Sequence, residues 1–441
     1  MEVALQRAQS PDPPSIFKLA DDLLYDIVLL SMHFDDTAIE PRFTRRTAPF
    51  VISSVCKRWR EFAINAASLW SEIHFNVSSP YPFQTLLLER SKTSPLNITI
   101  NDLRHFPRLG LTSISALVTL LRPHVCRIKT LSIACIDSAE RRRLTDELRA
   151  SAAPSLEELT LYGPTDSTKW KLEPFEGQTW KLSKLVVGCG RLNSGRELVH
   201  NLRWLELGVE KSLFMMEVTT FEILTLIYNA PCLETLILWM SSLQLGLGSR
   251  WKRPQILALN LRTLEVVSSG ERGRSSIPVV GLLKNIIAPQ LECMKSFICS
   301  SHEYWQPLVE CPRFPFPGLT RFSMIRDEDL SSFQEMKLTF FLWHLPNLQT
   351  LDITHRILSG PVSATISTSC PNLTEMVVTF SGKFQSMPIL KSIIIARQDS
   401  PYLNAIKVLR LVQASPQAFA KGPTSEDLDW LKAHVKNVMS C

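Results

Sequence analysis

The sequence lacks any long apolar run, although 45% of its 441 residues are hydrophobic. No stretch approaches the roughly 18 consecutive apolar residues that a membrane-spanning helix needs. The first 15 residues contain three prolines and none of the apolar segment that a secretory signal carries. These absences predict a chain that neither spans a membrane nor is secreted, and that resides in the cytoplasm, the nucleus or both.

The sequence also lacks paired cysteines. Its ten cysteines are scattered, with no C-x-x-C pair and no regular spacing. In a chain of this length that distribution predicts buried thiols in a reducing compartment rather than a disulfide framework. The nine histidines are isolated from one another, so no metal site is expected.

Motifs for catalysis and for nucleotide binding are missing as well. The glycines near Gly188 do not form G-x-G-x-x-G, and the loop that contains Gly270 has no Walker lysine. The pair His302-Glu303 lacks the second histidine of a zincin, and no G-x-S-x-G occurs. We therefore expect no enzyme activity, no catalytic residue and no cofactor.

Charge of one sign is not concentrated anywhere. The 48 basic and 42 acidic residues leave a net charge of +6, and the run Arg141–Arg143 lies between acidic residues, as on a solvated helix face. Such a distribution argues against nucleic acid as a partner.

What the sequence does contain begins with an amphipathic segment, Val51–Ala63. Its apolar side chains recur at helical spacing, with Lys57, Arg58, Arg60 and Glu61 on the opposite face. Alone, such a pattern is typical of an ordinary core helix. A second helical pattern precedes it at Ile16–Leu30, and Leu69–Phe75 follows, ending in the alternation of a strand.

Together these segments resemble the F-box. The matching stretches are Leu19–Val28, Val55–Ala63 and Leu69–Ile73, which correspond to the family's leucine-rich first helix, its Val-Cys-Lys-x-Trp-Arg helix and its terminal Leu-Trp. The polar segment from His33 to Pro49 is similar to the long-loop variant common in mushroom-type fungi. Ala20 stands where the family usually has proline, and Val28 where it often has phenylalanine.

The resemblance implies that this module binds the Skp adaptor, and through it a cullin, in a ubiquitin ligase. Carried over by position, the residues expected to contact the adaptor are Leu19, Leu23, Leu24, Ile27, Val55, Cys56, Trp59, Leu69 and Trp70. Some of them must instead hold the module together, and we expect Trp59 to do both.

Beyond about residue 96 the unit L-x-x-L-x-L recurs, with any aliphatic residue at each L. Copies start at Ile128, Leu156, Leu182, Leu202, Leu233, Leu261, Leu291, Leu319, Leu348, Leu373, Leu390 and Ile406. Most steps between copies are about 25 to 31 residues, the spacing of leucine-rich repeats. The asparagine that many such repeats carry after the strand is missing here. An ordinary α/β domain with a parallel sheet would also tolerate the pattern.

We therefore predict an α/β fold in four parts. Residues 1–14 are disordered, 15–76 form the all-helical module, 77–414 form an irregular leucine-rich-repeat solenoid of parallel strands and return helices, and 415–441 form a capping helix. The return helices are expected at 114–122, 139–150, 219–229, 279–288 and 338–343. Thr424–Asp427 resembles a capping box that begins the last helix.

Strand alternation predicts which side chains of the repeats face outward. The third and fifth positions of each unit lie opposite the core, which makes Lys184, Trp204, Glu206, Lys295, Arg321 and Asp352 candidates for a target-binding face, with Glu158, Glu265, Glu375 and Arg410 beside them. Trp204 could instead pack under a neighbouring loop.

The expected function is that of a substrate-recognition subunit of a Skp–cullin–F-box ligase, whose repeats hold an unknown protein target. Three alternatives remain open. The chain could be a non-catalytic leucine-rich-repeat scaffold without a ligase role, a family member that has lost its adaptor contact, or an enzyme with an unrecognised site.

Overall fold

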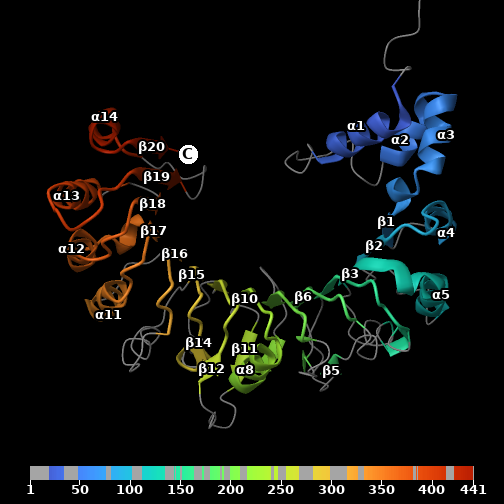
Figure 1. Cartoon of the computed structure of the whole chain (residues 1–441), viewed down its shortest axis with the longest axis horizontal. Coiled ribbons are helices and arrows are strands. Elements are labelled where there is room, and N and C mark those ends of the chain that lie inside the picture. The colour runs from blue at the N-terminus through green and yellow to red at the C-terminus, as the bar shows by residue number, and fades with distance from the viewer. Residues whose placement is uncertain are drawn as a thin grey trace, which may run out of the picture.

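The protein forms an arc in which the strands line the inner side and the helices the outer side (Figure 1). The computed structural model describes residues 19–33, 48–75, 81–101, 112–134, 144, 146–148, 151–162, 171–172, 179–188, 191–192, 199–208, 216–239, 243–246, 255–267, 282–297, 315–325, 332–380, 384, 386–413 and 422–440. The segments predicted to be disordered at 1–14 and to form a loop at 34–47 lie outside these residues.

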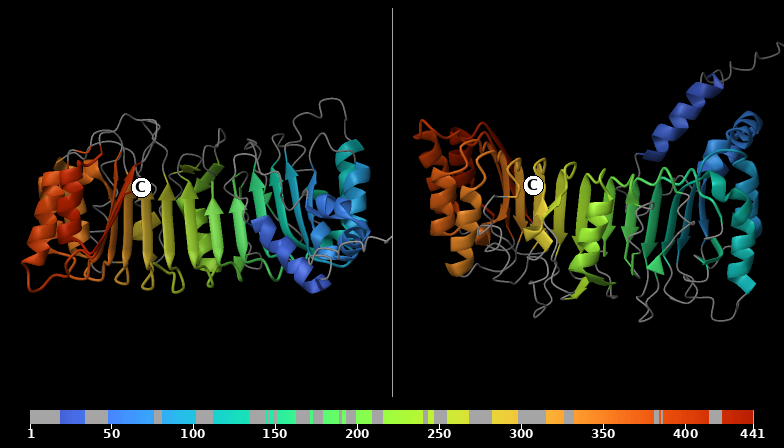
Figure 2. Two further views of the ribbon diagram at one scale, coloured as in Figure 1. Left: turned by 90° about the horizontal axis from the view of Figure 1, so that it is seen from above. Right: turned by 60° about the horizontal axis from the view of Figure 1, so that its bottom comes forward.

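One parallel sheet of 14 strands runs along the whole arc (Figure 2). Its strands in spatial order are β1 (Glu72–Phe75), β2 (Leu96–Asn101), β3 (Ile128–Ala134), β4 (Glu158–Tyr162), β6 (Lys184–Val187), β8 (Trp204–Leu207), β10 (Thr235–Trp239), β13 (Thr263–Val267), β15 (Cys293–Phe297), β16 (Arg321–Ile325), β17 (Thr350–Thr354), β18 (Glu375–Phe380), β19 (Val408–Gln413) and β20 (Asn437–Ser440). Spatial order follows chain order, so the predicted α/β class with a parallel sheet is confirmed.

The repeat unit explains why each strand forms where it does. In the unit at Leu261, the strand begins two residues later, and Leu261, Leu264 and Val266 are all buried between sheet and outer layer. The Leu261 N–H donates to the carbonyl of Ala258 three residues earlier. The same turn precedes the strands at Leu156, Leu182, Leu202, Leu233, Leu291, Leu319, Leu348 and Leu373, so each strand starts from a hydrogen-bonded turn on a buried residue.

An asparagine ladder, not foreseen from the sequence, joins neighbouring repeats at these turns. The amide of the residue just before the first leucine donates to a backbone carbonyl of the preceding repeat, in the pairs Asn201 to Trp180, Asn260 to Pro231, Asn347 to Pro317 and Asn372 to Pro346, at 2.8 to 3.0 Å. These four repeats thus carry an asparagine before the strand, whereas many leucine-rich repeats carry one after it. Gly318 occupies the same place in its repeat, where a Cβ would lie 2.6 Å from the carbonyl oxygen of Pro289.

The outer layer is made of helices and short strand pairs. The helices are α4 (Tyr81–Arg90), α5 (Thr112–Leu121), α8 (Thr220–Asn229), α11 (Ser332–Trp343), α12 (Gly360–Thr368) and α13 (Met387–Gln398), with 3-10 turns η4 (Arg122–Arg127) and η6 (His355–Ile357). The strand pairs are β5 (Lys171–Leu172) with β7 (Arg191–Leu192), β9 (Met216–Thr219) with β11 (Leu243–Gly246), and β12 (Ile256–Leu257) with β14 (Ile286–Ile287).

The return helices predicted at 114–122, 219–229 and 338–343 are confirmed, and the last is longer than expected. The helix predicted at 279–288 is wrong at its end, because Ile286 and Ile287 form β14. The unit predicted to start a strand at Leu390 is also wrong, since that residue lies inside α13. The apolar residues of this unit fit the spacing of a helix as well as that of a strand, so the sequence pattern does not distinguish the two structures. The helix predicted at 139–150 lies largely outside the described residues.

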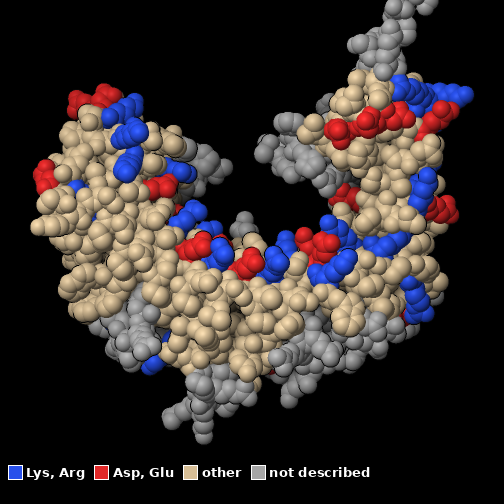
Figure 3. Space-filling model, in the orientation of Figure 1, with Lys and Arg blue, Asp and Glu red and all other residues tan. Residues whose placement is uncertain are grey.

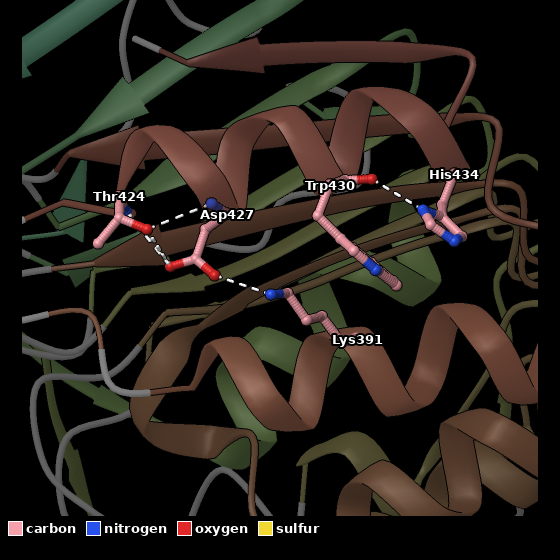
Figure 4. Close-up of polar contacts among 5 residues, drawn as sticks. All are labelled: Lys391, Thr424, Asp427, Trp430 and His434. Atoms are coloured by element: carbon pink, nitrogen blue, oxygen red, sulfur yellow. Dashed lines mark hydrogen bonds and ion pairs between the residues drawn. The ribbon is translucent and has the colours of Figure 1, made fainter.

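The C-terminal end is closed by α14 (Ser425–His434) and β20. Thr424 caps α14 with the predicted capping box, in which its side chain and that of Asp427 satisfy each other's backbone N–H groups (Figure 4). Val438, expected on the last helix, lies instead in β20, which adds a final strand to the sheet. The end of the array is therefore covered by a helix and extended by a strand.

The N-terminal helices are α1 (Asp21–His33), α2 (Ala48–Val55), α3 (Lys57–Asn65) and the 3-10 turn η2 (Ala67–Trp70), which we call the helical module. The single helix predicted for Val51–Ala63 is broken at Cys56, whose extended backbone makes it the N-cap of α3. Its thiol accepts a hydrogen bond from the Trp59 N–H at 3.5 Å. β1 follows directly and pairs with β2, so the sheet begins inside the segment assigned to the module.

In the part of the chain that the structure describes, no helix is both long enough and apolar enough to cross a membrane.

Candidate functional site

Two surfaces contain the residues singled out from the sequence: the helical module at one end of the arc and the inner face of the sheet. They differ in chemistry. The module presents exposed apolar side chains beside charged ones on short helices, whereas Lys, Arg, Asp and Glu follow the strands along the hollow of the arc (Figure 3).

Three of the residues expected to contact an adaptor are part of the core. Leu24, Leu69 and Trp70 have exposed fractions of 1%, 5% and 1%. The Trp70 indole donates to the Ala63 carbonyl at 2.6 Å, and its ring makes an edge contact with Phe50. A partner could reach these side chains only by unpacking the module, which corrects their assignment as surface contacts. The sequence pattern could not separate them because core and docking residues share the helical spacing.

Three other predicted residues are exposed apolar side chains. Leu23 and Ile27 lie one helical turn apart on α1 with exposed fractions of 51% and 45%, and Val55 at the end of α2 is 51% exposed. Leu30, Val51 and Ile64 are exposed in the same module and were missing from the prediction. Contiguous exposed apolar patches mark interaction sites, whereas single exposed apolar residues are common on protein surfaces. Leu23, Ile27 and Val55 therefore remain the candidates for docking.

The remaining three, Leu19, Cys56 and Trp59, are half-buried. Arg58 of α3 donates to the Leu19 carbonyl and pairs with Asp21 at 3.1 Å, which ties α3 to the start of α1. The Trp59 ring packs against the core, and its buried indole N–H has no hydrogen-bond partner among the described residues. Trp59 thus contributes to the module's own packing, and its contact with a partner stays a prediction.

On the inner face, the strand register aligns the third and fifth positions of successive repeats in two rows. One row contains Glu158, Lys184 and Trp204, and continues to Arg321 and Glu375. The other contains Glu206, Glu265, Lys295, Asp352 and Arg410. The predicted outward positions therefore lie together on one face, as strand alternation requires. Whether a target binds there stays a prediction.

Most charges in these rows are paired between neighbouring strands. Lys184 contacts Glu158 at 3.4 Å, Lys295 contacts Glu265 at 2.5 Å, and Arg410 contacts Glu375 at 2.9 Å. Such half-exposed pairs contribute little to stability. They neutralise the inner face locally, so it has no strong overall preference for one sign of charge.

A second polar group lies around Asp352. Its carboxylate accepts a hydrogen bond from Ser323 at 3.0 Å, while its other oxygen is buried without a partner among the described residues. Burial raises the pKa of Asp352, against the Ser323 hydrogen bond and the charges of Lys295 and Arg321. Burial likewise raises the pKa of the nearby Cys293 thiol, so this cysteine is a poor nucleophile.

Aromatic side chains occupy another part of the inner face. Trp204 is 36% exposed, and the Lys184 ammonium lies 5.6 Å from its ring centre. Trp239 donates its indole N–H to Glu206 at 2.6 Å. Trp239 was missed from the sequence because it stands at the seventh position, one step beyond the unit that was counted.

The outer face carries an apolar pocket of about 500 Å³ between α8 and β12, lined by Ile227, Tyr228, Leu233, Leu257 and Leu259 among others. None of the residues that line this pocket is His, Cys, Asp, Glu, Lys or Arg. Within the described ranges, no group of three or more His, Cys, Asp and Glu side chains is placed to hold a metal ion. Neither feature points to catalysis.

Comparison with known proteins adds little. No family model matches the chain, and no curated protein shows significant similarity to it. A crystal structure of a protein from Bacteroides fragilis aligns over 74% of this chain and 81% of that chain, with 14% sequence identity and a TM-score of 0.34. A likeness of this degree carries no argument about family or function. The two surfaces therefore have to be interpreted from their own chemistry.

Proposed function

We propose that the protein is the substrate-recognition subunit of a Skp–cullin–F-box ubiquitin ligase. In this proposal the helical module is an F-box that docks on the Skp adaptor, and the array is a leucine-rich-repeat domain that binds a target protein. The observation that carries the proposal is the set of exposed apolar side chains Leu23, Ile27 and Val55 on a small module at one end of the sheet.

The mechanism requires no bond chemistry from this chain. A target held on the inner face would have its lysines kept near the ubiquitin donor, which raises their effective concentration. Continuous pairing from β1 to β2 supports this role, because it holds the module and the repeats in a fixed relation.

A pull-down with purified Skp adaptor tests the proposal. Leu23→Glu combined with Ile27→Glu places charge where apolar contact is expected, so adaptor capture should fall at least about tenfold. Both positions are exposed, so the fold should persist. Met336→Glu is a matched control, since that residue is a 53% exposed apolar side chain on the distant helix α11.

If the unmodified protein captures no adaptor, or if the double variant captures as much as the wild type, the F-box assignment is lost. The chain would then be better described as an interaction scaffold without a ligase role.

A further inference from the structure

On four adjacent strands, corresponding positions are occupied in order by Tyr162, Gly188, Gly208 and Trp239. One aromatic residue therefore lies at each end of this row, with the two glycines between them. Gly188 follows β6 and donates its N–H to Leu161 of β4, while Gly208 follows β8 and donates to Val187, both at 2.8 Å. Tyr162 and Trp239 hold the corresponding places on β4 and β10. Their Cα atoms are therefore about three strand spacings, or about 14 Å, apart. No side chain from the intervening glycines fills the space between them.

Glu206 lies in the middle of this arrangement, two residues before Gly208 on the same face. Its neighbours in the row are Val186 on β6 and Ile237 on β10, which are only 3% and 7% exposed. Trp204 precedes it by two residues on β8. Glu206 thus has buried aliphatic neighbours on both adjoining strands and an aromatic residue two positions before it.

Glu206 differs from the other glutamates of this face in the kind of partner that the structure gives it. Its carboxylate accepts the Trp239 indole N–H at 2.6 Å, and no Lys, Arg or His of the described residues forms an ion pair with it. Glu158, Glu265 and Glu375 on the same face each have a basic partner. Its field also reaches Tyr162, whose pKa is raised by burial and further by Glu206.

We propose that Glu206, Tyr162, Trp204 and Trp239, which we call the Glu206 cluster, form a subsite for a lysine or arginine side chain of a protein partner. A carboxylate attracts such a cation, and aromatic ring faces stabilise it further through their quadrupoles. Lys184, already placed over Trp204, shows that an ammonium group is accommodated at one of these rings. The proposal deepens the proposed function, because it rests on the inner face being the target-binding surface.

The test uses the full chain labelled with 5-fluorotryptophan and observed by fluorine NMR, with Trp204→Phe and Trp239→Phe assigning the two resonances. The probes are N-acetyl-arginine methylamide, N-acetyl-lysine methylamide and the uncharged N-acetyl-norleucine methylamide at constant ionic strength. Both cationic probes should shift the two resonances saturably, with norleucine at least about tenfold weaker because it lacks the charge.

Glu206→Gln is the decisive variant, because a glutamine oxygen can still accept the Trp239 indole while the charge is gone. It should weaken the cationic probes about tenfold. Glu265→Gln is the matched control, since Glu265 lies in the same row but pairs with Lys295, and it should leave binding unchanged. Unaltered resonances of the other tryptophans check the fold of each variant.

Three results would overturn the proposal: no saturable shift with either cationic probe, equal affinity for norleucine, or full affinity in Glu206→Gln. None of them involves the adaptor. A negative result in the fluorine NMR titration therefore does not affect the interpretation of the adaptor pull-down. Loss of adaptor capture, in turn, does not decide whether the Glu206 cluster binds cations.

Discussion

Arg397 in α13 has 0% of its surface exposed, and its guanidinium faces backbone carbonyls rather than a carboxylate. It donates to the carbonyls of Ile366, Ser369, Cys370, Leu373 and Asn404 at 2.8 to 3.1 Å. The first four lie at the end of α12 and in the turn before β18, and Asn404 lies between α13 and β19. The side chain thus supplies hydrogen-bond donors to buried backbone carbonyls, of which that of Cys370 also accepts from a backbone N–H, that of Leu373.

Arg397→Met should lower the free energy of unfolding by more than about 3 kcal/mol, because several buried carbonyls lose their donors at once. Urea denaturation followed by circular dichroism measures the loss. Arg203→Met is the control, since Arg203 is 68% exposed and makes one ion pair of 3.7 Å, and it should cost below about 1 kcal/mol. Equal losses in both variants would contradict this account of Arg397.

Asp352 and Asp427 should respond to pH in opposite directions. Burial raises the pKa of Asp352, so its proton binds the folded state more tightly and stability falls as pH rises from 3.8 through the raised pKa. The hydrogen bond from Lys391 lowers the pKa of Asp427, so its contribution is present above 3.8 and is lost as pH falls through the lowered pKa.

Asp352→Asn should therefore gain stability relative to the wild type as pH rises above 3.8, whereas Asp427→Asn should be less stable at neutral pH and approach the wild type in acid. Denaturation midpoints of the three proteins across this pH range measure both differences. Parallel pH profiles for the two variants would rule out the interpretation.

At the scale of elements, α14 is held by its cap and by contacts to α13 (Figure 4). Lys391 reaches Asp427 at 2.8 Å and lies 5.2 Å from the Trp430 ring centre, and His434 stacks on that ring at 3.9 Å. Thr424 ties the first turn to the Asp427 carboxylate at 2.8 Å. A ten-residue helix alone is marginal in water, so these contacts decide whether α14 stays docked.

Thr424→Ala should destabilise α14 locally by about 1 kcal/mol, since the cap hydrogen bonds are lost. Amide hydrogen exchange should then be faster in α14 while the central strands keep their protection. Ser425→Ala, one residue further along, changes a side chain outside the capping box and should leave exchange as it is. Uniformly faster exchange along the whole chain would show that the cap stabilises the whole fold rather than α14 alone.

For the whole molecule, stability is expected to come from contacts between neighbouring repeats, so the ends of the array need cover. Removing residues 422–441 takes away β20, which pairs with β19, and Leu431, whose side chain is fully buried. The shortened protein should form oligomers, because the six-residue strand β19 replaces the four-residue strand β20 as the edge of the sheet and apolar surface is exposed. Size-exclusion chromatography with light scattering measures this.

Met439→Lys provides the comparison, because it alters a 45% exposed residue of β20 while keeping the strand in place, and it should remain monodisperse. A shortened protein that elutes as a monomer with an unchanged denaturation midpoint would show that the terminal segment is dispensable.

Features of this fold that depend on residues close in sequence could be predicted, whereas features that depend on distant residues could not. Most strands of the main sheet followed from L-x-x-L-x-L, apart from β1, β2, β20 and the wrong copy at Leu390, because side-chain alternation is a property of a single strand. Thr424 was recognised because a cap involves only four residues. The asparagine ladder and Arg397 could not be foreseen, since all their acceptors except the Asn404 carbonyl lie 21 to 31 residues away. Leu24 and Leu23 are adjacent and equally apolar, yet one is core and the other exposed, which only packing decides.

The unbroken sheet from β1 to β20 has one further consequence. The module continues directly into β1, which is hydrogen-bonded to β2, so the distance between the two surfaces can be counted in strands. Inserting or deleting one repeat would move one surface past the other by about 4.8 Å together with a fixed rotation. Relatives that differ in repeat number would then hold their inner faces at distances from the module that differ by whole strand spacings.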